Sequence, residues 1–202
     1  MMRRRFLLVL VVGAVLAAAA GAGAAFLVRS SAYRPTIEIP GDKVLPDFTL
    51  VDQNGRDFSI SSLKGRAVLI YFGYTHCPDV CPLVMTKYKQ LLDALGPDAD
   101  KVALIFITVD PERDTPEVMR DYLHYYSDRI IGLTGEPSRV EEVLHKYDVT
   151  AVKREPDASG NYFVDHFAFI FGADRNLVLR LAFTPEMSLQ EYLDGVRYLL
   201  SK

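Results

Sequence analysis

Two continuous apolar runs, Ala67–Phe72 and Val102–Val109, constrain the fold of this chain more than any other feature. Apolar runs of this length without alternation are typical of strands that are buried on both faces of a helix-covered parallel sheet. Between them, apolar residues recur at helical spacing from Leu83 to Leu95, until Gly96-Pro97 ends the pattern. The segment therefore predicts a βαβ unit at the centre of an α/β domain.

Shorter signals extend this unit at both ends. Asn54-Gly55 lies between two alternating stretches and predicts an N-terminal β-hairpin, and Asp174-Arg175-Asn176 predicts a second hairpin near the C-terminus. We also expect a short strand over 130–133 and helices over 116–126, 138–147 and 189–200. Strands that alternate with helices favour a mostly parallel sheet with an antiparallel edge. The predicted fold is α/β and thioredoxin-like, with an added N-terminal β-hairpin.

The N-terminus carries an uninterrupted apolar run from Phe6 to Val28, directly after three arginines at 3–5. Twenty-three residues at ~1.5 Å each form a helix of about 34 Å, enough to cross a hydrocarbon layer of ~30 Å. The preceding arginines favour an N-terminus on the inner side, with the rest of the chain exported. We interpret residues 1–28 as one transmembrane anchor. A cleaved signal peptide is the alternative, because Ala22-Gly23-Ala24 fits a small-residue cleavage site.

We interpret residues 29–43 as a linker and residues 44–202 as a single domain. The chain has a net charge of −3, and residues 1–43 carry six basic and two acidic side chains, so residues 44–202 carry a net charge of −7. An acidic domain without a cluster of basic residues argues against a nucleic-acid partner.

The only two cysteines of the chain, Cys77 and Cys81, follow the first buried strand. Open α/β sheets place their sites at the carboxyl ends of strands. Pro82 predicts a helix that begins there, and a helix N-terminus lowers the pKa of a nearby thiol. Two close thiols either form a disulfide or bind one soft metal ion. The C-x-x-x-C spacing is one residue longer than the C-x-x-C of disulfide exchangers, which favours the metal and leaves thiol–disulfide exchange as the alternative.

Two thiolates leave a metal site incomplete, and the chain has four histidines. We favour His166 as third ligand, because it precedes the apolar run Ala168–Phe171 and thioredoxin-like folds bring that point close to the cysteine loop. His76 adjoins Cys77, but neighbouring side chains point in different directions. His124 and His145 fall in predicted helices and are expected at the surface. Two sulfurs and one imidazole suit copper, since thiolates select Cu(I) and the imidazole lets Cu(II) bind as well.

Three further features have two interpretations each, and a fourth has one. Asp79 is either a helix-cap carboxylate or a group that tunes thiol acidity, and Asp165 either orients His166 or is an ordinary loop aspartate. The charged segment 110–114 follows the second buried strand, where it is either a docking rim or hydrogen-bond network near the site, or a plain charged loop. Residues 155–162 predict an exposed flexible loop that lets the histidine move in and out of the coordination sphere.

Several segments together resemble the Sco/SenC family, whose members are membrane-tethered thioredoxin-like proteins involved in assembling the copper A centre of cytochrome c oxidase. The resemblance covers essentially all of 44–202. Its segments are Pro46-Asp47-Phe48 with Asp52 and Gly55, Tyr74–Pro82, Thr108–Glu117 and Val164-Asp165-His166.

The resemblance implies that Cys77, Cys81 and His166 bind copper, as Cu(I) or Cu(II). It implies a membrane-anchored metallochaperone whose partner is the oxidase subunit carrying the copper A site, with a second periplasmic copper carrier as a further partner. The alternative is a thiol–disulfide oxidoreductase that keeps that subunit's cysteines reduced. The implied location is a bacterial-type inner membrane, with one span and the domain on the periplasmic side. Phe167 departs from the family pattern, which has a small hydroxyl residue there, and the turn at 174–176 lacks the usual glycine.

Overall fold

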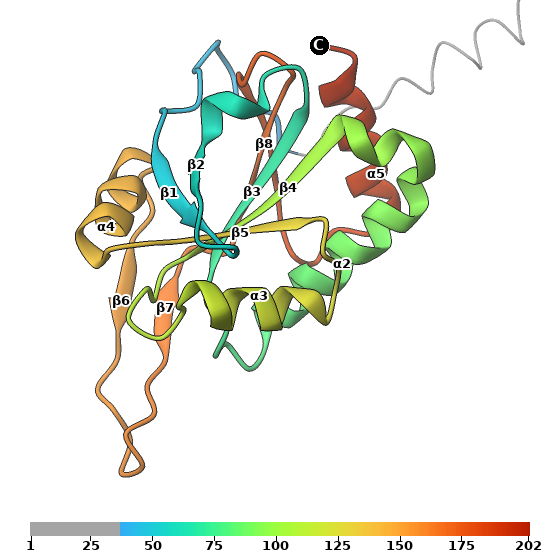
Figure 1. Ribbon diagram of the computed structural model, residues 1–202. Helices are drawn as coiled ribbons and strands as arrows, with labels where there is room; N and C mark the ends of the chain where they lie inside the picture. Colours follow the sequence, from blue (N-terminus) through green and yellow to red (C-terminus); the bar gives the residue numbers. More distant parts are fainter. Residues whose placement is uncertain (1–36) are drawn as a thin grey trace, which may run out of the picture. The chain divides into compact units, whose positions relative to one another are not determined.

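A seven-stranded sheet runs through the part of the chain that the computed structural model describes, residues 37–202 (Figure 1). Its strands lie in the order β2-β1-β5-β4-β3-β8-β9. Their bounds are β1 Thr49–Asp52, β2 Asp57–Ser59, β3 Ala67–Gly73, β4 Val102–Thr108, β5 Ile130–Thr134, β8 Ile170–Ala173 and β9 Leu179–Phe183. A separate two-stranded ribbon consists of β6 Ala151–Lys153 and β7 Val164–His166.

The two apolar runs form the middle of the sheet, as predicted. β3 and β4 are parallel neighbours with every residue buried, and β5 continues the parallel arrangement beyond β4. All other pairs in this sheet are antiparallel, namely β1 with β2 and β5, and β8 with β3 and β9. The expectation of a mostly parallel sheet is therefore wrong. Each hairpin adds two antiparallel strands, so only a three-stranded centre is parallel.

Helices cover both faces of the sheet. Tyr71 and Phe106 point to the face that carries α2 and α3, whereas Phe72 on the other face packs against Tyr147 at the end of α4. The side chains of Thr115 and Ser188 cap α3 and α5, as their sequences predict. The helices are α2 Val80–Leu95, α3 Pro116–His124, α4 Pro137–Lys146 and α5 Leu189–Leu200, with short 3-10 helices at Ile60–Leu63 and Gly96–Lys101.

The turn between β8 and β9 forms without glycine. Leu177 takes the left-handed conformation, with a φ of 63°, that glycine usually supplies. The buried carboxylate of Asp174 accepts hydrogen bonds from the backbone N–H groups of Asn176 and Val178. A side chain therefore holds this turn.

The register of the central strands places two loops side by side. Gly73 at the end of β3 pairs with Thr108 at the end of β4, and the N–H of Val109 donates to the carbonyl of Gly73. The cysteine loop, 74–79, and the β4–α3 loop, 109–115, therefore leave the sheet at the same edge. The segment 110–114 belongs to the second of these loops and therefore lies at the same edge as the cysteines, as predicted.

The β6–β7 ribbon extends away from the main sheet (Figure 1). Sequence patterns predicted only its exposed loop, because each strand has three residues and carries polar side chains. Cross-strand pairs join Ala151 to His166 and Lys153 to Val164. Val164 is the only buried residue of the two strands. The mobility expected for residues 155–162 stays a prediction.

The start of the described chain runs along the edge strand β9. The N–H of Ile39 donates to the backbone carbonyl of Arg180. The N–H groups of Leu179 and Ala182 donate to the backbone carbonyls of Lys43 and Ile37, respectively. Residues 37–43 of the expected linker are thus hydrogen-bonded to the domain. The apolar run from Phe6 to Val28, interpreted as an anchor, lies outside the described residues. Within 37–202, no helix is long and apolar enough to cross a membrane.

Candidate metal centre

The two cysteines differ in their surroundings. Cys77 lies in the loop after β3 and is half-buried, whereas Cys81 lies in the first turn of α2 and is completely buried. Asp79 precedes the helix, but its side chain makes no capping hydrogen bond. Both thiols are free, with no disulfide between them.

His166 completes a group of three ligands. It is the last residue of β7, and its Nε2 lies 3.8 Å from Sγ of Cys81. The ligand atoms of Cys77, Cys81 and His166 all lie within 4.8 Å of one another. Two bonds of the kind that such ligands make to a first-row metal, about 2.0–2.3 Å each, span at most about 4.6 Å. One ion therefore fits between the three atoms after shifts of a few tenths of an ångström.

A backbone carbonyl orients His166. The Nδ1 atom of the ring lies 3.2 Å from the carbonyl oxygen of Phe167, so Nδ1–H donates and the lone pair of Nε2 faces the cysteines. The side chain of Phe167 is half-exposed and stacks on Phe169. The departure from the family pattern at this position therefore leaves the contact that holds the histidine intact.

The proposed role of Asp165 as the orienting group is wrong. Its carboxylate accepts a hydrogen bond from Nε of Arg154 at 2.7 Å. Successive residues of a strand point to opposite faces, so Asp165 lies on the outer face of the ribbon and His166 on the inner one. Asp165 is exposed, and its ion pair with Arg154 lowers its pKa.

The other three histidines lie elsewhere, as expected. His76 is exposed and its Nδ1 lies 3.0 Å from the hydroxyl of Thr75. His124 pairs with Asp128 at the surface. His145 is exposed on α4. None of them belongs to the ligand group that residues 37–202 contain.

A shared proton distinguishes the two thiols. A hydrogen bond from the Cys81 thiol lowers the pKa of Cys77 to about 3, while burial opposes this effect. The bond to Cys77, together with burial, raises the pKa of Cys81 above its usual value. Cys77 is therefore the thiolate of the metal-free site and Cys81 the thiol.

The buried wall of the site was not predicted. The hydroxyl of Tyr71 lies 3.4 Å from Sγ of Cys81, and the rings of Tyr71 and Tyr74 meet the ring of His166 edge to face. A Cβ on Gly73 would lie 2.9 Å from Sγ of Cys81 and closer still to two aromatic rings. Tyr71 was assigned to the first buried strand and Gly73 directly follows it, and their position just before the cysteines was the available signal.

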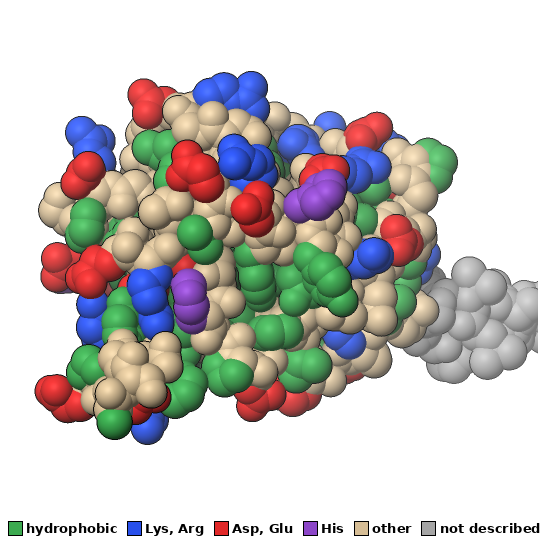
Figure 2. All heavy atoms as spheres, turned by 60° about the horizontal axis from the view of Figure 1, so that its bottom comes forward, with side chains coloured by type: hydrophobic (Ala, Val, Ile, Leu, Met, Phe, Trp, Pro, Cys, Tyr) green, Lys and Arg blue, Asp and Glu red, His purple; other side chains and the backbone are tan. Residues whose placement is uncertain are grey.

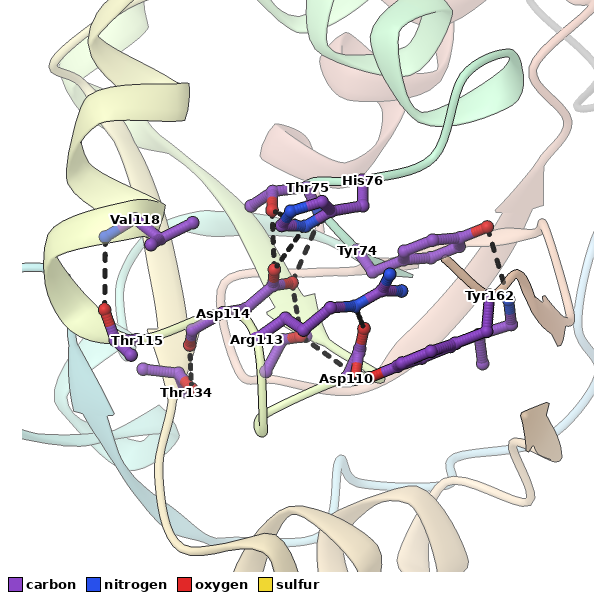
Figure 3. A network of polar contacts seen from close by, with 12 residues as sticks. Tyr74, Thr75, His76, Asp110, Arg113, Asp114, Thr115, Val118, Thr134 and Tyr162 are labelled. Carbon is purple, nitrogen blue, oxygen red and sulfur yellow. Dashed lines mark hydrogen bonds and ion pairs between the residues drawn. The ribbon is translucent and has the colours of Figure 1, made fainter. Parts of the chain in front are cut away.

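The charged segment 110–114 forms a hydrogen-bond network that holds the cysteine loop (Figure 3). The buried carboxylate of Asp114 accepts from the N–H and the hydroxyl of Thr75, at 3.0 and 2.6 Å, and from the hydroxyl of Thr108 at 2.6 Å. Burial raises the pKa of this carboxyl, against the effect of those hydrogen bonds. Of its two interpretations, the structure supports the network beside the site.

The donor set suits copper better than zinc. Two sulfurs and one imidazole match the soft ligands that select Cu(I), and the imidazole also serves Cu(II). Structural zinc sites take four protein ligands, and the group found within residues 37–202 has three.

Figure 2 shows the face of the domain that lies at the bottom of Figure 1. Hydrophobic side chains gather at the centre of this face.

Comparison with known proteins agrees with this site. The model of the SCO1/SenC family matches residues 38–201. The SCO2-like protein RC0895 of Rickettsia conorii is 35% identical over 82% of this chain and 78% of its own length. The structure of Bradyrhizobium japonicum ScoI with copper bound is 42% identical, with a TM-score of 0.73, and covers 78% of this chain and 100% of that one.

A third match concerns the fold alone. BsSco, described as a member of the Sco family of cytochrome c oxidase assembly proteins, is 22% identical with a TM-score of 0.62, and covers 81% of this chain and 96% of its own. The matches span both the thioredoxin-like domain and the segments that carry the two cysteines and the histidine. This chain belongs to the SCO1/SenC family.

Proposed function

We propose that this protein binds one copper ion through Cys77, Cys81 and His166 and delivers it to the cytochrome c oxidase subunit that carries the copper A site. The observation that carries the proposal is the convergence of the three ligand atoms within 4.8 Å, from segments 85 residues apart in sequence. The copper-bound state of the 42% identical ScoI supports copper as the metal.

The two cysteines are suited to different parts of a transfer. Cys81 is buried against Tyr71 and holds its ligand position, whereas Cys77 is half-buried in a loop and can meet a thiolate of the acceptor. Transfer then proceeds by ligand exchange, in which acceptor thiolates replace Cys77 and His166 before Cys81. Cys77 is already ionised in the metal-free site, so copper binding releases the proton of the Cys81 thiol.

We also place the domain on the exported side of a bacterial-type inner membrane. The support is the apolar run from Phe6 to Val28 after three arginines, which the sequence predicts to span the membrane with its N-terminus inside. A further periplasmic copper carrier would load the site.

Titration of the reduced full-length protein in mild detergent with Cu(I), against a competing chelator, tests the copper function. We expect one equivalent bound with a submicromolar Kd, abolished by Cys77→Ser or Cys81→Ser and weakened by His166→Ala. His145→Ala on α4 is the matched control and should bind like the unmodified protein. Weak binding that does not depend on His166 would contradict the proposal.

Thiol–disulfide exchange is the second candidate function, and the low pKa of Cys77 favours it. The Cys77 thiolate would attack one sulfur of a disulfide in the oxidase subunit, which breaks that bond, releases the other sulfur as a thiolate and leaves a mixed disulfide. Cys81 would then lose its proton, attack the sulfur of Cys77 and displace the second target thiolate. Two electrons pass to the target, and this protein is left with a Cys77–Cys81 disulfide. His166→Ala separates the two functions, because it should impair copper binding while sparing exchange.

A further inference from the structure

The β6–β7 ribbon is fastened to the β4–α3 loop by Tyr162. The hydroxyl of Tyr162 donates a hydrogen bond of 2.8 Å to Oδ1 of Asp110, whose carboxylate is buried. The guanidinium carbon of Arg113 lies 3.6 Å from the centre of the Tyr162 ring. On the ribbon itself, Nζ of Lys153 lies 4.5 Å from the same centre. Tyr162 is therefore held by a hydrogen bond and by cations over its ring.

Arg113 connects this contact to the cysteine loop. Its Nε donates to the other carboxylate oxygen of Asp110, and its guanidinium carbon lies 5.8 Å from the centre of the Tyr74 ring. Figure 3 shows Arg113 lying between Tyr74 and Tyr162, with Asp110 beside it. The hydroxyl of Tyr74 in turn accepts a hydrogen bond of 3.3 Å from the N–H of Val164. The loop and the ribbon are thus joined at two points near the site.

These contacts matter because the ribbon has little stability of its own. It consists of two three-residue strands with one buried side chain, and isolated two-stranded hairpins are marginally stable in water. His166 is the last residue of this ribbon, four residues after Tyr162. The position of its imidazole relative to the cysteines therefore depends on what holds the ribbon in place.

We propose that Tyr162, Asp110 and Arg113 form a latch that holds His166 within reach of the two cysteines, and that opening the latch removes the histidine from bound copper. The inference rests on the proposed copper function and identifies positioning residues for it. With the latch closed, copper has two sulfurs and one nitrogen. With the latch open, the ribbon swings away and leaves a two-thiolate site, from which an acceptor can take the ion.

The test compares Tyr162→Phe with Tyr198→Phe in the full-length reduced protein. Each variant loses one tyrosine–carboxylate hydrogen bond, since Tyr198 on α5 donates to Glu38 at 3.1 Å, away from the site. We expect Tyr162→Phe to weaken Cu(I) binding about threefold to tenfold and to speed release to a chelator by the same factor. Tyr198→Phe should change neither quantity.

The same comparison in a His166→Ala background shows whether the effect passes through the histidine. We expect Tyr162→Phe to have no further effect there. Equal weakening in both backgrounds, or no weakening in either, would overturn the latch.

Hydrogen exchange in the copper-free protein gives a second readout that does not need metal. If the latch holds the ribbon, Tyr162→Phe accelerates exchange of the Val164 and His166 amides by a similar factor, and Tyr198→Phe does not. Unchanged exchange at these amides would contradict the latch even if copper affinity fell. If the unmodified protein binds no copper while exchange responds as expected, the copper function fails and the latch as a holder of the ribbon stands.

Discussion

The hydroxyl of Tyr71 lies 3.4 Å from Sγ of Cys81, inside the domain and away from solvent. This hydrogen bond lowers the pKa of Cys81, against the larger effects of Cys77 and burial, which raise it. The phenol is thus a buried side chain that favours the ionised form of the Cys81 sulfur, and the backbone of Tyr74 acts in the same direction. Since a metal binds the thiolate, Tyr71 is placed to assist loading.

Tyr71→Phe should therefore weaken Cu(I) binding at pH 7. Hydrogen bonds to charged groups contribute about 1.5–3 kcal/mol, so we expect a loss of affinity of about tenfold or more. Competition with a chelator measures it. Thermal unfolding should change little, because the ring stays packed and only a hydroxyl is removed. Affinity equal to that of the unmodified protein would show that the phenol does not act on the sulfur.

Gly73 leaves space for the Cys81 sulfur, and Gly73→Ala should damage both the fold and the site. The added Cβ would meet Phe106 at 2.7 Å, Tyr71 at 2.8 Å and Cys81 at 2.9 Å. Overpacking of this kind costs about 1–3 kcal/mol of unfolding free energy. We expect that loss in denaturant unfolding, together with weaker Cu(I) binding by the folded protein.

Gly195→Ala is the matched control for this change. Its Cβ would meet two ring atoms of Phe183 at 2.4 and 2.7 Å, on helix α5 away from the cysteines. It should cost a similar free energy of unfolding and leave copper affinity unchanged. If both variants, or neither, altered copper affinity, the special role of Gly73 would be wrong.

The centre of the fold could be predicted from sequence because its signals are local. The apolar runs of β3 and β4, and the Asn54-Gly55 turn, each indicate one element without reference to the rest. The antiparallel pairing of β1 with β5 could not be read in this way, because strand order depends on contacts distant in sequence. The β6–β7 ribbon was missed because three-residue strands such as Ala151–Lys153 carry too short a pattern.

The site was predictable only in part. The spacing of the cysteines indicated their chemistry, and the position of His166 before an apolar run, together with the family resemblance, indicated the third ligand. Tyr71 looks like an ordinary member of a buried strand, and only its distance from Cys81 shows that its hydroxyl is used. The group that orients His166 is the backbone carbonyl of Phe167, which is common to every residue type, so the sequence could not indicate it.

Asp114→Ala should destabilise the protein more than most single substitutions. The carboxylate is buried, and its removal leaves the N–H of Thr75 and the hydroxyls of Thr75 and Thr108 without their acceptor. Unsatisfied buried groups cost about 1–3 kcal/mol each before relaxation, so we expect a loss of about 3 kcal/mol in urea unfolding.

Asp100→Ala is the control for that variant, because the Asp100 side chain is 88% exposed in its pair with Arg129. Exposed ion pairs contribute little, and its effect should stay within about 0.5 kcal/mol. A loss below 1 kcal/mol for Asp114→Ala would mean that the network does not hold the cysteine loop.

The asymmetry of the thiol pair predicts unusual pH behaviour for the reduced, metal-free protein. With a pKa of about 3, Cys77 stays ionised in mild acid, whereas an ordinary thiol has a pKa near ~8.5 and reacts about tenfold more slowly per pH unit below it. Iodoacetamide should therefore modify Cys77 at rates that agree within about threefold between pH 8 and pH 5. Cys81 is buried and should react little.

Stability should follow the same titrations. The folded state lowers the pKa of Cys77. The Cys77 thiolate therefore contributes fully to the free energy of unfolding above the pKa that Cys77 has in the unfolded chain, and this contribution is lost as pH falls towards about 3. The pKa of Cys81 is raised, so the effect has the opposite sign. The Cys81 thiol contributes to the free energy of unfolding below the pKa that Cys81 has in the unfolded chain, and this contribution is lost as pH rises above that pKa.

The variant Cys81→Ser replaces the thiol that donates to Cys77 with a hydroxyl. If Cys77 is alkylated more slowly at pH 5 in this variant, the difference in rate measures how much better the thiol stabilises the Cys77 thiolate than the hydroxyl does. In the unmodified protein, an alkylation rate that falls tenfold per pH unit from pH 8 to pH 5 would show that the two thiols do not share a proton.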